Sequence, residues 1–193
     1  CLVAVAVIFG VAGAVQAAHS DHGCHNCHVP HKAGDPTDPT VHGVPLWSNA
    51  QTADGLPTFT LYSSPSFDAL GTDIGQPDGP SKLCLGCHDG SYAVFAFIPD
   101  SQAVFGPDDL ARSHPVSFTY DTALSGKVAN GALRDPATAL SSLGGTIAAD
   151  LLDDQSKMQC TSCHDVHLSG KTEYLLHIDI DTEGDEVLCR ICH

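Results

Sequence analysis

Basic side chains, aromatic side chains and methionine are scarce in this sequence. Its 193 residues include 8 Lys and Arg against 23 Asp and Glu, which gives a formal net charge of −15 at pH 7. A chain this acidic is not attracted to phosphates, so no nucleic acid and no anionic membrane surface is expected as a partner. Aromatic residues make up 6 % of the chain, with one Trp and one Met. Because such side chains form only a small core, we expect a non-protein group to fill part of the interior.

A hydrophobic segment without charge occupies residues 2–18 and reads LVAVAVIFGVAGAVQAA. It is short for a membrane span but long enough for a signal peptide, and Val15 and Ala17 suit a signal peptidase site. We expect residues 1–17 to be a cleaved export signal, truncated at its charged start, and residues 18–193 to be the mature domain. A retained anchor is the alternative. The mature chain is then extracellular or periplasmic, with no stable membrane span, in a compartment that oxidises thiols.

Eight of the nine cysteines form four pairs of identical spacing, and a histidine follows each pair. The pairs are Cys24/Cys27, Cys84/Cys87, Cys160/Cys163 and Cys189/Cys192, followed by His28, His88, His164 and His193. C-x-x-C-H is the attachment signature of c-type haem. The two thiols form thioethers with the porphyrin, and the adjacent imidazole ligates the iron. The sequence therefore predicts four haem c groups, which would also supply the apolar bulk that the side chains lack.

Paired cysteines have three other uses besides haem attachment. Eight cysteines in an exported protein can form four disulfides. Pairs of C-x-x-C can hold two structural zinc ions, and a single C-x-x-C can be a redox dithiol. None of these requires a histidine after every second cysteine, so haem attachment is favoured over all three.

Each six-coordinate haem iron also needs a distal ligand. Met158 is the only methionine and lies two residues before Cys160, so we expect it to pack rather than to reach the far face of that haem. Histidine is therefore the expected distal ligand at most or all sites, which implies low-spin iron and low potentials. The preferred distal residues are His19, His31, His114 and His167, with His22 and His42 ranked lower and with His25 and His177 expected to face solvent or to pack.

Two of the motifs extend to C-x-x-C-H-x-x-H and end at His31 and His167. If the motif histidine begins a helical turn, the histidine three residues later lies on the same face. The two therefore cannot ligate one iron from opposite sides. We expect His31 and His167 each to ligate a haem attached elsewhere in the chain, which brings the haems into close contact.

The sequence around the other candidate distal histidines predicts their conformation to different degrees. Pro115 holds His114 in an extended conformation between the second and third motifs. His19 and His22 lie near the expected mature N-terminus, and His42 lies in a loop rich in Pro and Gly. His19 is preferred, but His19, His22 and His42 remain alternatives for the fourth distal ligand.

The expected fold is mostly coil with short helices and few short strands, wrapped around four stacked covalent haems. Residues 57–62, 93–98 and 116–120 have the composition of short strands. Residues 147–158 are expected to form a helix that leads into the third motif.

Several phrases resemble exported multihaem c-type cytochromes of metal-reducing bacteria. They are VPLW at 44–47, TLYSSP at 60–65, SKLCLGCHDG at 81–90, SHPVSF at 113–118 and CTSCHDVH at 160–167. In that group the histidine of Ser-His-Pro-Val looks like a distal ligand, which supports His114. The first C-x-x-C-H-x-x-H also resembles the extracellular cytochromes that polymerise into conductive filaments. That resemblance implies that His31 ligates a haem of the neighbouring subunit.

The sequence thus favours an electron-transfer protein over an enzyme. The extracellular form would be a filament of identical subunits, and the alternative is a soluble periplasmic shuttle. Its partners would be other redox proteins or extracellular electron acceptors. A multihaem oxyanion reductase is less favoured, because no C-x-x-C-K variant occurs and the acidic chain repels anions.

Overall fold

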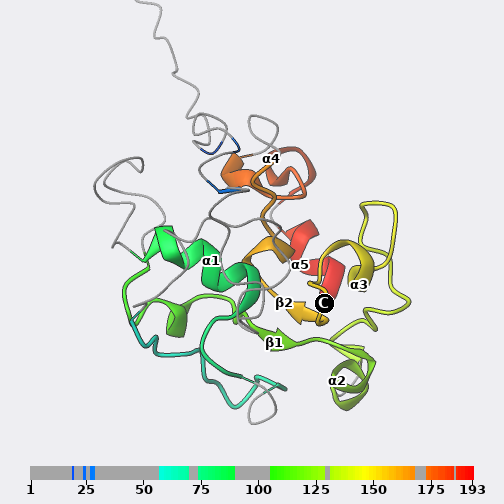
Figure 1. Cartoon of the computed structure of the whole chain (residues 1–193). Helices are drawn as coiled ribbons and strands as arrows, with labels where there is room; N and C mark the ends of the chain where they lie inside the picture. Colours follow the sequence, from blue (N-terminus) through cyan, green and yellow to red (C-terminus); the bar gives the residue numbers. More distant parts are fainter. Residues whose placement is uncertain are drawn as a thin grey trace, which may run out of the picture.

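The computed structural model describes His19, Cys24, Cys27, His28 and residues 57–69, 74–89, 105–128, 131–167, 173–184 and 186–193. These residues are mostly coil, with short helices and one two-stranded sheet (Figure 1). The α-helices are α1 (Gly79–His88), α2 (Thr122–Lys127), α3 (Ile147–Asp150), α4 (Ile180–Glu183) and α5 (Glu186–Cys192). Short 3-10 helices are η4 (Leu110–Arg112), η6 (Cys160–Ser162) and η7 (Glu173–Leu175), and the strands are β1 (Phe118–Thr119) and β2 (Lys157–Met158).

The sheet joins two segments that lie far apart in the sequence. β1 and β2 are antiparallel, with Phe118 opposite Met158 and Thr119 opposite Lys157. The N–H of Ser117 donates to the carbonyl of Met158 at 2.6 Å and extends the pairing by one residue. The strand expected at 116–120 is therefore present in shortened form, and Met158 belongs to the strand that leads into the third motif.

The helix expected over residues 147–158 is wrong beyond its first turn. α3 ends at Asp150, and Asp153 then accepts hydrogen bonds from the N–H groups of Gln155 and Lys157 at 2.9 and 2.8 Å. This turn directs the chain into β2. Pairing with a distant strand has overridden the local helix preference, as tertiary contacts often do.

The strand expected at 57–62 is also wrong, because this segment is coil. The side-chain amide of Gln76 bonds to both backbone groups of Phe59, at 2.8 and 3.0 Å. The N–H of Thr60 donates to the carbonyl of Pro107 at 2.7 Å. A side chain thus meets the hydrogen-bonding needs that a partner strand would otherwise meet. The segment 93–98 lies outside the described residues.

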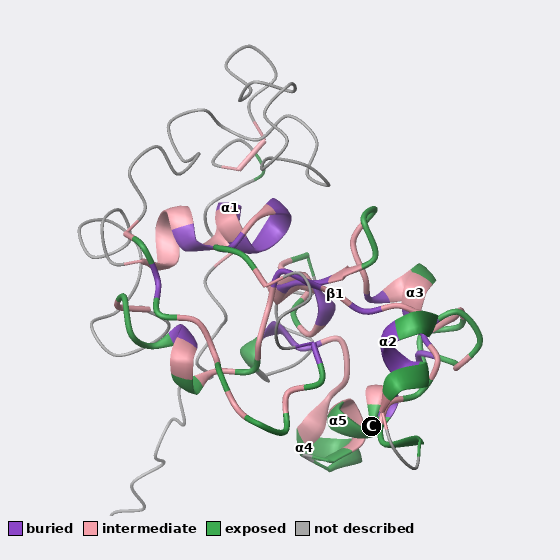
Figure 2. Cartoon of the chain, turned by 90° about the horizontal axis from the view of Figure 1, so that it is seen from below, coloured by how far each residue is buried: buried purple, intermediate pink, exposed green. Residues whose placement is uncertain are grey.

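Buried apolar side chains form two clusters beside the cysteine motifs. The larger cluster surrounds the sheet and contains Ala69, Phe118, Tyr120, Leu124, Ile147, Leu151, Met158 and Ile191. The smaller consists of Phe59, Leu85 and Leu110, so α1 contributes through Leu85. Figure 2 shows buried residues along α1 and β1, whereas exposed residues gather on α2, α4 and α5. Met158 and Ile191 place the larger cluster beside the third and fourth motifs, and Leu85 places the smaller one beside the second.

The residues that flank α1 explain where this helix begins and ends. Asp78 precedes the helix in an extended conformation and a proline follows in the first turn, where its missing N–H costs nothing. The helix ends at His88, with the N–H of Asp89 bonded to the carbonyl of Leu85 at 2.9 Å. The second motif therefore occupies the last turn of α1.

Candidate haem-attachment sites

Each cysteine motif forms one helical turn. The N–H of the histidine donates to the carbonyl of the first cysteine in the same motif. This bond joins His28 to Cys24 at 2.8 Å, His164 to Cys160 at 3.0 Å and His193 to Cys189 at 3.0 Å. In the second motif the corresponding residues lie within α1. Because residues three and four positions apart share a helix face, each motif directs both thiols and its imidazole toward the same side.

Two motif histidines are oriented through the ring nitrogen Nδ1. Nδ1 of His164 lies 2.8 Å from the carbonyl oxygen of Tyr174, and Nδ1 of His193 lies 3.3 Å from that of Ala132. A carbonyl oxygen only accepts, so the proton is on Nδ1 and the lone pair is on Nε2. Metal-bound histidines use this arrangement, in which the second nitrogen donates to a carbonyl or carboxylate.

Two of the predicted distal histidines have the same orientation. Nδ1 of His114 lies 2.9 Å from the carbonyl oxygen of Pro115, and Nδ1 of His167 lies 3.2 Å from the Oδ1 of Asp165. Both therefore keep Nε2 as the acceptor nitrogen. Sequence reasoning found these histidines, but their oxygen partners have no recognisable signal in the sequence.

His177 has the opposite arrangement. Its Nε2 lies 2.9 Å from the carbonyl oxygen of Thr161, and the side chain is half-buried. The proton is then on Nε2, so that nitrogen holds no lone pair for a metal. His177 packs against the third motif.

Two pairs of imidazole rings bring together histidines from different parts of the chain. The ring centroids of His28 and His167 lie 6.4 Å apart with planes inclined by 16°. Those of His19 and His88 lie 5.8 Å apart with planes inclined by 28°. In each pair a motif histidine meets a predicted distal histidine that belongs to another segment. His167, which follows the third motif, is paired with the histidine of the first.

His114 lies near the histidine of the fourth motif. Desolvation lowers its pKa, the hydrogen bond with Pro115 opposes that shift, and the charge of nearby His193 lowers it further. The neutral imidazole, which is the ligating form, is thereby favoured. Leu61, Ile74 and Leu110 line the shallow pocket that His114 borders, so its ring lies beside an apolar surface.

None of the eight motif cysteines is joined in a disulfide. The thiols of Cys84 and Cys160 are hydrogen-bonded to each other. This bond, with help from the Ser81 hydroxyl, lowers the pKa of Cys160 to about 7 against the opposing effect of burial. The same bond and burial raise the pKa of Cys84 well above its usual value. The elements that carry these two cysteines are in contact, since α1 packs against η6.

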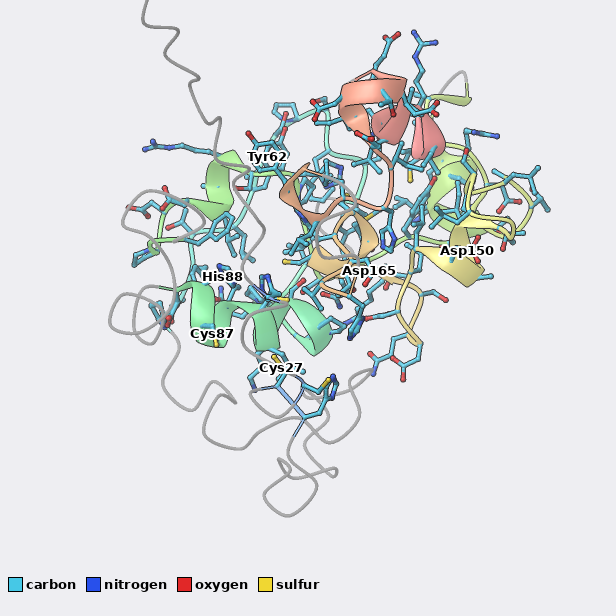
Figure 3. All side chains as sticks on the ribbon, turned by 90° about the horizontal axis from the view of Figure 1, so that it is seen from above. Cys27, Tyr62, Cys87, His88, Asp150 and Asp165 are labelled. Atoms are coloured by element: carbon cyan, nitrogen blue, oxygen red, sulfur yellow. The ribbon has the colours of Figure 1, made fainter. Side chains whose placement is uncertain are left out.

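The pKa values of Cys87 and Cys163 also depend on cysteines of other motifs. Burial raises the pKa of Cys87 to about 11, and Cys27 adds to this shift. Burial also raises the pKa of Cys163 to about 11, with contributions from Cys160 and Cys189. Figure 3 shows Cys27 near Cys87 and His88, the last two residues of α1. In the described parts of the chain, no group of three or more His, Cys, Asp or Glu side chains is arranged to hold a bare metal ion.

Four of the 12 histidines lie outside the described residues: His22, His25, His31 and His42. The structure therefore places three of the four preferred distal residues, His19, His114 and His167. Among the described helices, none is long and apolar enough to cross a membrane.

Comparisons with known proteins add no relative. No protein-family model matches the sequence, and no curated protein matches it either.

Proposed function

We propose that this chain is an exported tetrahaem c-type cytochrome that transfers electrons through bis-histidine haems and does not act as an enzyme. The observation that carries the proposal is the pairing of His28 with His167 across a ring-centroid distance of 6.4 Å. The two residues belong to different motifs, and local chain geometry alone does not bring them together.

The spacing of the paired rings fits a metal between them. A metal–imidazole bond is about 2 Å, and the centre of an imidazole ring lies roughly 1 Å from its atoms, so opposite ligands have centroids about 6 Å apart. The observed separations are 6.4 Å for His28 and His167 and 5.8 Å for His19 and His88. Residues of this chain thus suit the first and second haems, with His167 and His19 as distal ligands.

The cysteines and oxygen partners would complete these sites. The two thiols of each turn would add across the two vinyl groups of the porphyrin to form thioethers, and the histidine beside them would offer Nε2 to the iron. The carbonyls of Tyr174 and Ala132 hold the rings of His164 and His193 in that tautomer. When bound, haem iron supplies one-electron redox chemistry, and the protein sets its spacing and potential. His114 is the distal residue proposed for the fourth motif, because the bond of its Nδ1 to the Pro115 carbonyl leaves Nε2 to ligate and the charge of His193 acts on it.

The third motif is the one without an assigned distal ligand. Among the described histidines, no ring is paired with that of His164. His22, His31 and His42 are the residues left for this haem. In the proposed extracellular filament His31 of a neighbouring subunit would ligate it, whereas in a soluble periplasmic shuttle the ligand would come from the same chain. The filament rests on the resemblance to polymerising cytochromes.

Two measurements on the native secreted protein test the proposal. Mass spectrometry should give a chain mass increased by four haems, and electron paramagnetic resonance should show low-spin ferric iron. A chain without covalent haem would overturn the whole function. Electron microscopy of the same fraction then separates the two forms, because filaments support the polymer and small particles support the shuttle.

A further inference from the structure

The contact between the second and third motifs is held by buried polar side chains. α1 packs against η6, and the N–H of Cys160 donates to the hydroxyl oxygen of Ser81 at 3.0 Å. Ser81 has no exposed surface and lies three residues before Cys84. One hydroxyl group therefore links the helix that carries the second motif to the first residue of the third.

Gln159, the residue before Cys160, forms further hydrogen bonds across the contact between α1 and η6. It is 1 % exposed. Its Nε2 donates to the Oδ1 of Asp78 at 3.1 Å and to the Oδ2 of Asp153 at 2.7 Å, and its Oε1 accepts from the hydroxyl of Ser117 at 3.0 Å. Asp78 directly precedes α1, so the amide of Gln159 ties the start of that helix to the start of η6.

Ser117 and Lys157 complete the network. The N–H of Asp78 donates to the hydroxyl of Ser117 at 3.1 Å, and Lys157 forms an ion pair with the Asp78 carboxylate. Ser117 adopts a φ of 58°, which is uncommon for a residue other than glycine. Such a conformation persists only where its surroundings hold it. We call Asp78, Ser81, Ser117, Lys157 and Gln159 the motif clamp.

A clamp of this kind sets position more closely than apolar packing does. Its hydrogen bonds are directional, and breaking one leaves a buried polar group without a partner, which is unfavourable. The second and third motifs therefore cannot slide past each other without losing several such bonds. Their thiols at Cys84 and Cys160 stay in contact as a consequence.

The other motifs adjoin this pair in sequence order. Cys27 of the first motif lies near Cys87 of the second (Figure 3). Ile191 of the fourth motif packs in the same apolar cluster as Met158, two residues ahead of the third. The geometric link between the second and third motifs is the packing of α1 against η6 and the bond from the Cys160 N–H to Ser81.

We propose that the four haem-attachment sites form a row in the order of the sequence, and that the motif clamp, through Ser81 and Gln159, holds the second and third sites as its closest pair. This inference rests on the proposed function, because it assigns positions to haems that the function requires. Ser81 and Gln159 are positioning residues, because they hold α1 and η6 together without being proposed to contact a haem.

The first test is a structure of the haem-containing protein. The expected result is a row of irons in the order of the four motifs, with the shortest gap between porphyrin edges at the second and third haems. Another order, or a shorter gap elsewhere, would overturn the inference while leaving four haems and electron transfer intact. A chain that carries no covalent haem would instead overturn the proposed function.

The second test is Ser81→Ala in the haem-containing protein, with Ser141→Ala as the matched control. Ser141 is equally buried, but its hydroxyl bonds to Asp150 and Gly145, away from the motif contact. Circular dichroism in the Soret band reports the coupling of neighbouring haems. With the haem count checked by mass spectrometry, Ser81→Ala should lose couplet amplitude and Ser141→Ala should keep it. An unchanged couplet in Ser81→Ala, or an equal loss in both variants, contradicts the role of the clamp.

Discussion

The imidazole rings of His28 and His167 lie 6.4 Å apart with nearly parallel planes, although one follows the first cysteine pair and the other the third. Asp165 orients the ring of His167 by accepting from its Nδ1 at 3.2 Å. If an iron lies between the two rings, the ligand next to the third motif serves the haem of the first. Replacing His167 should therefore affect the haem of the first motif, although His167 follows the third.

His167→Ala should open the haem attached at the first motif. That iron loses its distal imidazole, so one ferric haem per chain changes from low spin to high spin. Electron paramagnetic resonance measures the change, and mass spectrometry confirms that the haem count is unaltered. His177→Ala is the control, because Nε2 of His177 is bonded to the carbonyl of Thr161. A wholly low-spin spectrum of His167→Ala would remove this residue from the ligands.

Combining His19→Ala with His167→Ala should open two haems. His19 is paired with His88 and His167 with His28, so the variants act on different irons. The high-spin signal of the double variant should equal the sum of the two single variants. If both histidines competed for one iron, the double variant would show no more high-spin iron than the stronger of the two singles.

Replacing Cys189 and Cys192 together by alanine should remove one covalent haem. The two thiols and His193 belong to one turn, closed by the bond from the His193 N–H to the Cys189 carbonyl. Without the thioethers the haem of the fourth motif is not retained. The mass of the secreted chain should fall by one haem beyond the change in the side chains. An unaltered number of haems would show that the fourth motif is not an attachment site.

Tyr120→Phe should destabilise the protein by about 1 kcal/mol, which is the usual net value of one hydrogen bond. The Tyr120 hydroxyl donates to the carbonyl of Arg134 at 2.5 Å, and its ring is 1 % exposed. Thermal unfolding should shift downward by about 2 to 4 °C for a chain of this size.

Tyr62→Phe is the comparison for that prediction. The ring of Tyr62 lies against that of Phe67, with centroids 5.5 Å apart, but no hydrogen bond of its hydroxyl occurs within the described part of the chain. Its melting temperature should stay close to that of the unaltered protein. Equal shifts in the two variants would mean that the Tyr120 hydroxyl bond contributes nothing to stability.

The alternation at 116–120 predicted a strand, which the structure contains in shortened form as β1. The helical turn that each cysteine motif forms was not predicted and is a finding of the structure. The expectation failed at 57–62, where the amide of Gln76 replaces a partner strand, and beyond Asp150, where the chain pairs with β1. Both failures arise from residues that are distant in the sequence.

The C-x-x-C-H motifs and their arrangement in space differ in the same way. By itself the sequence determined which thiols and histidines form each motif, because C-x-x-C-H is a local pattern that one helical turn satisfies. Only the tertiary structure decided that His167 meets His28, that His19 meets His88 and that Cys84 contacts Cys160. These pairings depend on long loops closing and on buried side chains such as Ser81 and Gln159 finding partners across the fold. Loop closure and burial are properties of the whole packed chain, and no short stretch of sequence encodes them.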